Sequence, residues 1–571
     1  MLKIKTLVVI AFSVLISVTS IAQNPLTIPT ALSGTEFDLT LQHGSVEFTP
    51  GVTTQTMGVN GNILGPTLIF EQGETVNIDI HNEIDDTTTI HWHGMHIPSE
   101  MDGGPHTPFG PGETWSPSFT ILDHASTMWY HPHLMHKTNE HVQMGIAGFV
   151  IIKDAEEAAL NLPRTYGVDD IPVVFQTKTI DSAGQIVTDM DYAGLDTLVL
   201  ANGTPNAYFD APAQMFRVRM LDASSERSYN IGLSNNDTFH VIGSDGGLLT
   251  SPVSMTRLLI SPGERYEILI DLNGMEGESV QIMNYGTSFP TGVYGNANTA
   301  GPAAADPIPF YAENQLNGSN FPLLTLNVIT STLNPVTTVP SSLADNTSWD
   351  DSTIDMTRQI TMSPDGGMMG PQGLNGPFLF NGETFDMSVV NYEIDLNATE
   401  VWTLTNQSAI AHPFHIHDIQ FNVIEYNGGT PPSHLSGWKD VILVPAMMGT
   451  VKFITRFEDF ANPDIPYMYH CHILVHEEGG MMGQFVVVDR NGIESVVENE
   501  TFSLYPNPAK DNIKIELMNA GEEVVTIRDI SGRIVMTSKI NGLSSSIDIR
   551  LFTSGVYFVS LGNLTSRFIK E

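Results

Sequence analysis

The chain of 571 residues has only one cysteine, Cys471, so no disulfide can form within it. Basic residues are also few, because 24 lysines and arginines stand against 64 acidic residues, for a formal net charge of −40 at pH 7. Such a surface repels phosphate backbones, so we expect no nucleic acid among the partners. The negative charge favours solubility or, alternatively, the attraction of cationic substrates, metal ions included.

Long apolar runs are scarce as well. The run at residues 7–18 is too short to cross a bilayer comfortably. Because Lys3 and Lys5 precede it and Ala22 ends a small-residue cleavage site, residues 1–22 are predicted to be a signal peptide. No later stretch is apolar enough for a transmembrane segment. We therefore expect a protein that is secreted or held at the cell surface.

Apolar stretches of helical period are few, whereas 49 glycines and 34 prolines indicate many turns. Residues 67–70 and 76–80 read as strands joined by a turn at Gly73. Related patterns recur within 202–220 and 381–404. We predict an all-β fold of three tandem Greek-key β-sandwich domains and a small C-terminal β-sandwich.

Segments rich in proline at 302–309 and 335–340 are typical of loops and linkers. With the signal peptide at 1–22, they divide the chain into predicted domains at 23–160, 161–335, 336–495 and 496–571. The last of these contains no histidine, so it does not share the chemistry of the others.

Ten of the 19 histidines fall in four clusters. These clusters are His91-Trp92-His93, His131-Pro132-His133, His412 with His415 and His417, and His470-Cys471-His472 with His476. Residues two apart on a strand point to the same side, so each His-x-His pair can present two imidazoles on one face. Because buried imidazoles need partners, four such pairs from two domains indicate a shared metal cluster. Between His141 and His412 only His240 occurs, so we expect no metal in the middle domain.

The cysteine adds a soft ligand to the fourth cluster. A thiolate, two imidazoles and a distant thioether form a trigonal blue-copper site, here Cys471, His412, His476 and Met481. Zinc is the competing metal, but a structural zinc site usually contains several cysteines or a compact four-ligand loop. A cysteine flanked by histidines suits electron transfer better, because the thiolate binds one metal while its neighbours bind others.

With these motifs, residues 30–490 resemble the three-domain multicopper oxidases of the laccase, bilirubin oxidase and bacterial copper-efflux oxidase superfamily. The resemblance implies cupredoxin-like domains and four copper ions, one of type 1, one of type 2 and two of type 3. The implied type 1 ligands are His412, Cys471, His476 and axial Met481, and the type 2 ligands are His91 and His415. One type 3 copper is implied at His93, His131 and His472, and the other at His133, His417 and His470.

The resemblance also implies the activity. A donor loses single electrons at the type 1 copper, and dioxygen is reduced to water at the other three. Every ligand position is filled, whereas copper-free relatives that serve as scaffolds have lost ligands, so we expect catalysis. Dioxygen reduction consumes protons, and acidic residues at the places of Asp102 and Glu477 assist their delivery in bacterial relatives. For Asp102, which precedes two glycines, a turn-forming role is the alternative.

The donor is left open by the sequence. Thioethers suit cuprous ion, and the 25 methionines include Met362, Met368, Met369, Met447 and Met448, although methionine also fills cores and flexible loops. The copper-efflux oxidases have Asp and Met where Ser408 and Ile410 stand here, which argues against a metal-ion donor. Phenols, aromatic amines and bilirubin-like compounds remain, and an axial Met481 favours easily oxidised donors. A non-enzymatic copper-binding scaffold is the competing function.

Residues from about 499 resemble the type IX secretion sorting domain of Bacteroidetes. The matching pieces are Tyr505-Pro506-Asn507-Pro508, residues 529–533 and residues 554–557. The resemblance implies that the C-terminal domain binds the secretion machinery, that the protein crosses the outer membrane, and that the domain takes no part in catalysis. A small β-sandwich binding module is the alternative.

Overall fold

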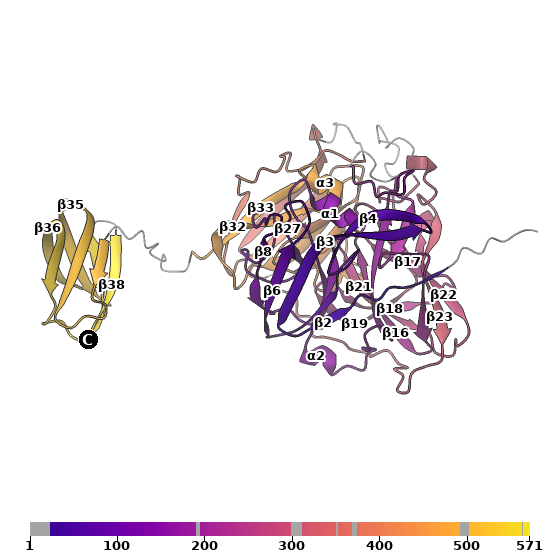
Figure 1. The fold of residues 1–571 in the computed structure, drawn as a ribbon, viewed down its shortest axis with the longest axis horizontal. Coiled ribbons are helices and arrows are strands. Elements are labelled where there is room, and N and C mark those ends of the chain that lie inside the picture. The colour runs from indigo at the N-terminus through magenta and orange to yellow at the C-terminus, as the bar shows by residue number, and fades with distance from the viewer. Residues whose placement is uncertain are drawn as a thin grey trace, which may run out of the picture. The chain divides into compact units, whose positions relative to one another are not determined.

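A computed structural model describes residues 23–189, 195–297, 311–349, 352–367, 374–490, 502–530, 532–561 and 564–571. The predicted signal peptide, Met368 and Met369 lie outside these ranges. The described chain is nearly all β, which confirms the predicted fold class (Figure 1). Within the described ranges, no helix is long and apolar enough to cross a membrane. The chain forms two compact units, Met1–Val488 and Asp489–Glu571.

The first β-sandwich in the larger unit consists of two sheets. One has the order β4-β3-β6-β8, with β9 also on β6: β3 (Glu36–Thr49), β4 (Val52–Val59), β6 (Thr75–Asn82), β8 (Thr114–Trp115) and β9 (Ser118–Thr120). The other has the order β2-β5-β11-β10-β7: β2 (Ala31–Ser33), β5 (Thr67–Glu71), β7 (His91–His93), β10 (Ser126–His131) and β11 (Gly148–Lys153). The predicted strands at 67–70 and 76–80 are confirmed as β5 and β6. On β6, Val76, Ile78 and Ile80 alternate into the core.

The second sandwich surrounds a large apolar core. Its seven-stranded sheet, in the order β14-β13-β12-β16-β21-β18-β19, contains β12 (Asp170–Lys178), β13 (Leu198–Ala201), β14 (Thr204–Pro205), β16 (Met215–Asp222), β18 (Phe239–Ser244), β19 (Gly247–Met255) and β21 (Arg265–Asp271). Its six-stranded sheet, in the order β1-β15-β23-β22-β17-β20, contains β1 (Asn24–Pro25), β15 (Ala207–Pro212), β17 (Tyr229–Leu233), β20 (Leu258–Ile260), β22 (Ser279–Tyr285) and β23 (Asn320–Ile329). The N-terminal strand β1 therefore extends a sheet whose other strands come from far along the chain.

The third sandwich carries the later histidine motifs. One sheet, β25-β24-β27-β31-β29, contains β24 (Met356–Pro364), β25 (Phe378–Phe380), β27 (Thr399–Asn406), β29 (Phe421–Tyr426) and β31 (Gly449–Arg456). The other, β26-β33-β32-β28-β30, contains β26 (Tyr392–Asp395), β28 (His412–Ile416), β30 (Val441–Val444), β32 (Asn462–Cys471) and β33 (Met482–Val488).

Helices are short and few among the described residues. They are α1 (Thr138–Met144), α2 (Ala155–Ala158), α3 (Leu474–Glu478) and the 3-10 turns η2 (Gly286–Ser288), η4 (Tyr311–Glu313) and η6 (Ser433–Leu435). Because α3 begins just after β32, it turns the chain back so that His476 lies beside Cys471.

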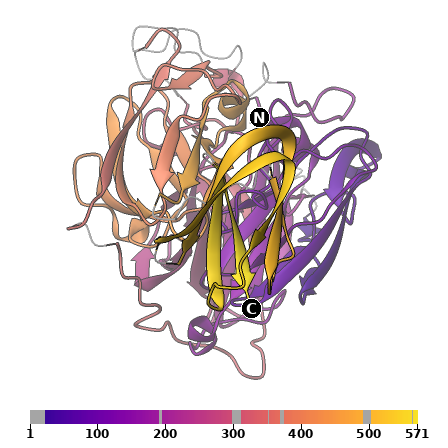
Figure 2. The ribbon, with the colours of Figure 1, turned by 90° about the vertical axis from the view of Figure 1, so that its left-hand side faces the viewer.

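The smaller unit is a five-stranded sheet with its own apolar core. Its strands are β34 (Phe502–Tyr505), β35 (Asn512–Asp529), β36 (Ile534–Asp548), β37 (Gly555–Leu561) and β38 (Leu564–Lys570). The long β35–β36 hairpin has a register shift between Glu516 and Gly521 and curves along its length (Figure 2).

An ion-pair chain joins the first and third sandwiches close to the histidine motifs. His96 follows β7, and its Nδ1 lies 2.9 Å from Oδ1 of Asp418, a buried residue that follows β28. The other ring nitrogen of His96 lies 3.2 Å from Oδ2 of Asp459. Burial alone would lower the pKa of His96, but the carboxylates of Asp418, Asp123 and Asp459 together outweigh burial, and the pKa is raised to about 10.

We predict that His96→Gln lowers the free energy of unfolding by about 3 kcal/mol near pH 6.5, because Asp418 then stays buried without its cation. A histidine whose pKa is raised on folding stabilises the folded state below its unfolded pKa of about 6.5 and loses that effect as pH rises through the folded pKa. Urea unfolding of variant and parent should therefore converge as pH approaches 10.

The exposed His124 supplies the control, since His124→Gln should change stability little at either pH. An equal loss for His96→Gln at pH 6.5 and above pH 10 would contradict the ion-pair role.

Candidate metal centre

Two neighbouring strands in each of two sandwiches carry the histidine motifs. In the first sandwich β7 pairs with β10, which places His91 opposite His131. In the third, β28 pairs with β32, which places His415 opposite His470. On β7 the strand period of two directs His91 and His93 to one face. In each of the other three His-x-His pairs the first histidine lies on a strand and the second follows the end of that strand.

Eight imidazoles from the two sandwiches meet in one buried group. They are His91, His93, His131, His133, His415, His417, His470 and His472, each 1% exposed or less. Nε2 of His133 lies 3.0 Å from Nε2 of His470 and 3.2 Å from Nε2 of His417, and the latter two are 3.4 Å apart. Three ring nitrogens cannot all share protons at these distances, so the arrangement fits a metal ion between them.

Hydrogen bonds on the outer side of the group fix which nitrogen faces inward. Nδ1 of His91 donates to the carbonyl of Asp102 at 2.9 Å, and Nδ1 of His415 donates to the carbonyl of Asp440 at 2.9 Å. A carbonyl only accepts, so Nε2 of both rings carries the lone pair. Among the described residues, neither Nε2 has a hydrogen-bond partner. Buried, unpaired lone pairs are what a metal ion requires.

Burial also favours the neutral form of six of these rings. It is the largest cause that lowers the pKa of His93, His131, His415, His417 and His472 well below the usual range, and neighbouring imidazoles lower it further. The same cause lowers the pKa of His133 to about 4. Neutral imidazole is the form that binds a metal ion.

The two carboxylates predicted from the sequence lie against this group. Oδ2 of Asp102 is 2.8 Å from Nδ1 of His417, and Oε2 of Glu477 is 3.2 Å from Nδ1 of His470. Both residues are 1% exposed. Burial raises the pKa of Glu477, but His470 and His133 outweigh it and lower the pKa to about 2, so Glu477 is an anion at neutral pH.

A third carboxylate, Asp440, was missed by the sequence reasoning. Its Oδ1 lies 3.0 Å from Nε2 of His93, so this ring faces its neighbours with Nδ1, which is 3.3 Å from Nε2 of His131. Both Asp440 oxygens are bonded to Arg265 at 2.6 Å. No spacing could reveal either residue, because Asp440 and Arg265 are remote from each other in the chain and outside every motif.

The second group lies on the opposite face of β32. Nδ1 of His412 is 3.5 Å and Nδ1 of His476 3.6 Å from Sγ of Cys471. Nε2 of His412 is held by the Ser408 hydroxyl at 2.8 Å, and Nε2 of His476 donates to the carbonyl of Leu374 at 2.7 Å. Both histidines therefore direct Nδ1 at the thiol.

This group is closed to water. Cys471, His412, His476 and Met481 are each 1% exposed or less. The main chain of Met481 is bonded to His476 and to Cys471, which places it beside both. Burial raises the pKa of the Cys471 thiol and lowers that of His476 to about 4, so a metal ion that binds here must displace the thiol proton.

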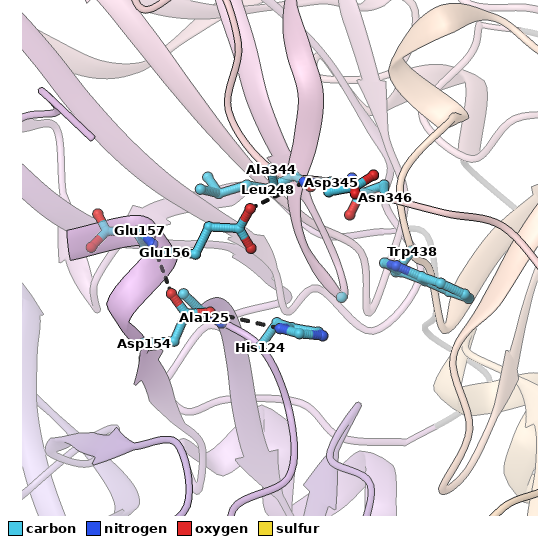
Figure 3. Close-up of a pocket in the computed structure, with 11 residues that line it drawn as sticks. His124, Ala125, Asp154, Glu156, Glu157, Leu248, Ala344, Asp345, Asn346 and Trp438 are labelled. Atoms are coloured by element: carbon cyan, nitrogen blue, oxygen red, sulfur yellow. Dashed lines mark hydrogen bonds and ion pairs between the residues drawn. The ribbon is translucent and has the colours of Figure 1, made fainter. Parts of the chain in front are cut away.

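The remaining histidines stand apart from both groups. His124 lines a cavity of about 20 Å³ with Asp154, Glu156 and Asp345, enough for about one water molecule (Figure 3). None of the predicted site residues lines this cavity. His106 bonds to Gln484 at 2.7 Å instead of joining a histidine group.

Known families match most of the chain. The multicopper oxidase family matches residues 40–157, 195–291 and 353–491. A secretion system C-terminal sorting domain matches residues 503–571. These matches confirm both resemblances expected from the motifs.

Named relatives include proteins with two different roles. The multicopper oxidase mco of Staphylococcus epidermidis is 32% identical over 461 residues, which are 79% of this chain and 88% of that protein. The cell division protein FtsP of Escherichia coli is 29% identical over 81% of this chain and 93% of its own length.

Solved structures agree with the fold. A laccase-like multi-copper oxidase CueO from Ochrobactrum sp., described as active towards lignin model compounds, is 32% identical with a TM-score of 0.71, covering 81% of this chain and 100% of that one. McoA from Aquifex aeolicus is 30% identical with a TM-score of 0.70, covering 82% and 100%. From its sandwiches, its buried histidine groups and these similarities, the chain belongs to the multicopper oxidase family and ends in a secretion sorting domain.

Proposed function

We propose that this protein is an active multicopper oxidase, which oxidises a small donor by single electrons and reduces dioxygen to water. One observation carries the proposal: Cys471 belongs to one buried group, while its chain neighbours His470 and His472 belong to the other. Bound copper supplies the one-electron redox chemistry and the activation of dioxygen. Because Cys471 is bonded through the backbone to both His470 and His472, the chain connects the two groups covalently.

The proposed ligands follow the two groups. His412, Cys471 and His476 would hold the type 1 copper with Met481 as weak axial ligand, and His91 and His415 the type 2 copper. The type 3 ions would be held by His133, His417 and His470, and by His93, His131 and His472.

Three-ligand sets support this proposal. The sets His412–Cys471–His476 and His133–His417–His470 each have ligand atoms within 4.8 Å of one another. His91 and His415 form such a set with His417, and His93 and His131 form one with His91. His472 is adjacent, with its ring centroid 4.9 Å from that of His93.

The alternative is a copper-free or copper-binding scaffold, which FtsP relatives with a cell-division role bring into consideration. A scaffold needs neither ten buried histidines nor a thiol between two of them. Burying polar groups without partners costs free energy, so the retained set favours the enzyme.

Asp102 and Glu477 are proposed to hold and deliver the protons that dioxygen reduction consumes. Each carboxylate lies within 3.2 Å of the outer nitrogen of a different histidine in the eight-imidazole group. From these positions they also fix the ring orientation of His417 and His470.

For the donor we propose an easily oxidised phenol, aromatic amine or bilirubin-like compound, with cuprous ion as the alternative. Met362 lies within β24 and is fully buried, so it fills the core and does not form a loop site. Met447 and Met448 are 56% and 50% exposed, and the Met447 N–H bonds to the carbonyl of Ser408. Of the residues that the structure describes, these two carry exposed thioethers that a cuprous ion could reach.

The sorting domain supports export. We propose that it binds the secretion machinery and that the oxidase works outside the cell or on its surface.

Cys471→Ser should abolish the blue colour and donor turnover, because a serine oxygen is a hard ligand that does not supply the thiolate-to-copper transition. The copper-loaded parent should be blue and contain about four coppers per chain. Visible absorption and metal analysis check both statements. The control Met362→Leu changes another buried sulfur and should stay blue. A colourless parent, or one that binds zinc, would contradict the proposal.

Asp102→Asn and Glu477→Gln should leave copper content nearly intact but slow dioxygen reduction, by about 10²–10⁴-fold where the carboxylate is the sole relay. The amides keep the size of the side chain but cannot carry a proton. In rapid-mixing spectra the blue colour should return slowly when dioxygen is added to reduced variants.

Glu478→Gln is the matched control, because that carboxylate accepts from the Asn139 amide and from no histidine. Return of colour at the parent's rate in both test variants would assign Asp102 and Glu477 to structural roles.

The double variant Met447→Leu/Met448→Leu should oxidise phenols at the parent's rate, because it removes exposed thioethers without changing a proposed ligand. Steady-state kinetics with a phenol panel and with cuprous ion separate the two donors. A selective rise in KM for cuprous ion, with phenol turnover absent in the parent, would favour the metal-ion alternative.

A further inference from the structure

The second sandwich contributes none of the proposed ligands, yet one of its turns touches the eight-imidazole group. This turn connects β20 to β21. Gly263 in the turn has a φ of +86°, and a Cβ there would lie 2.7 Å from the ring of His472. Only glycine fits this position, so the turn packs directly against a proposed ligand.

Arg265 begins β21 and is fully buried. Its Nη1 and Nη2 donate to the two oxygens of Asp440, each at 2.6 Å. Further bonds run from Nε to the carbonyl of Thr127 at 3.1 Å and from Nη2 to the carbonyl of Asp245 at 3.2 Å. The guanidinium therefore has a single orientation, and it fixes the plane of the carboxylate.

Asp440 in turn holds two imidazoles, one from each sandwich that carries proposed ligands. Its carboxylate lies 3.0 Å from Nε2 of His93, and its carbonyl accepts from Nδ1 of His415 at 2.9 Å. These two rings stack with centroids 3.8 Å apart and planes 8° from parallel. One residue thus sets both members of a stacked pair.

The ion pair also needs the glycine that follows His93. A Cβ at Gly94 would lie 2.5 Å from Nη2 of Arg265 and 2.5 Å from Oδ2 of Asp440. Both carboxylate oxygens of Asp440 accept from the guanidinium, which holds the carboxylate beside the two imidazoles.

We propose that Arg265 and Asp440 are a positioning pair, through which the second sandwich fixes the orientation of His93 and His415. The inference rests on the proposed function, in which these two rings hold copper. Hydrogen bonds on the outer nitrogen of a ligand histidine set its tautomer and its ring plane, and their loss typically weakens metal binding about 10–100-fold. The pair therefore governs copper affinity and the magnetic coupling of the type 3 ions.

Arg265→Lys tests the pair, because lysine keeps the charge but loses the two-pronged donor. We expect copper to be lost to a competing chelator about 10–100-fold more readily than from the parent. At full loading, the share of copper detected by electron paramagnetic resonance should rise, since misplaced ligands uncouple a pair that is silent when coupled.

Arg217→Lys is the matched control. Arg217 is equally buried in the second sandwich and its Nη2 pairs with Glu267, but its guanidinium bonds to neither Asp440 nor a histidine. Arg217→Lys should lower the free energy of unfolding about as much as Arg265→Lys, and it should leave the resonance signal and the copper affinity unchanged.

Asp440→Asn provides a second variant in case Arg265→Lys fails to fold. Asparagine keeps one side-chain oxygen and the main-chain carbonyl but loses one of the two oxygens that accept from Arg265. As with Arg265→Lys, copper retention should therefore weaken and the resonance signal should increase. Parent-like values in the folded variants, or the same change in Arg217→Lys, would overturn the positioning role. A parent that binds no coupled copper pair would instead overturn the proposed function itself.

Discussion

The structure depends on one constraint: eight imidazoles are buried together at the meeting of two β-sandwiches. Each ring has two nitrogens, and burial leaves no water to satisfy them. Outer nitrogens are held by protein groups such as the carbonyls of Asp102 and Asp440, and inner nitrogens face one another at 3.0–3.4 Å. A metal ion that joins the inner nitrogens would satisfy their lone pairs, so the packing of both sandwiches suits metal binding.

The contacts of the buried carboxylates explain how the eight-imidazole group is surrounded. Three buried carboxylates, Asp102, Glu477 and Asp440, surround the group, and each contacts the outer edge of a ring. Only Asp440 is neutralised by a partner cation, Arg265. Asp102 and Glu477 contact histidines, which suits groups that accept and release protons, whereas Asp440 is fixed in place. The carboxylate of Asp440 serves to fix ring positions because it also contacts Arg265, whereas the carboxylates of Asp102 and Glu477 suit proton transfer because they contact histidines.

The fold class, the family and the histidine motifs could be predicted because each depends on local pattern. Strand β6 follows from alternation, and the His91–His93 pair on β7 follows from the period of a strand. Contacts between remote segments could not be predicted. Arg265 and Asp440 meet only through the packing of the second and third sandwiches, and β1 joins a sheet of the second one. Likewise methionine fills both cores and flexible loops, so the burial of Met362 within β24 could not be predicted.

The two histidine groups are proposed to act together in reducing dioxygen. The most direct test is the ratio of donor oxidised to dioxygen consumed by the copper-loaded protein, measured with an oxygen electrode. The donors are a panel of phenols and, separately, cuprous ion. Reduction to water requires four electrons, so about four one-electron donors should be consumed per dioxygen without release of peroxide. Copper-loaded protein that binds its metal yet consumes no dioxygen with any donor would contradict the account and indicate a scaffold.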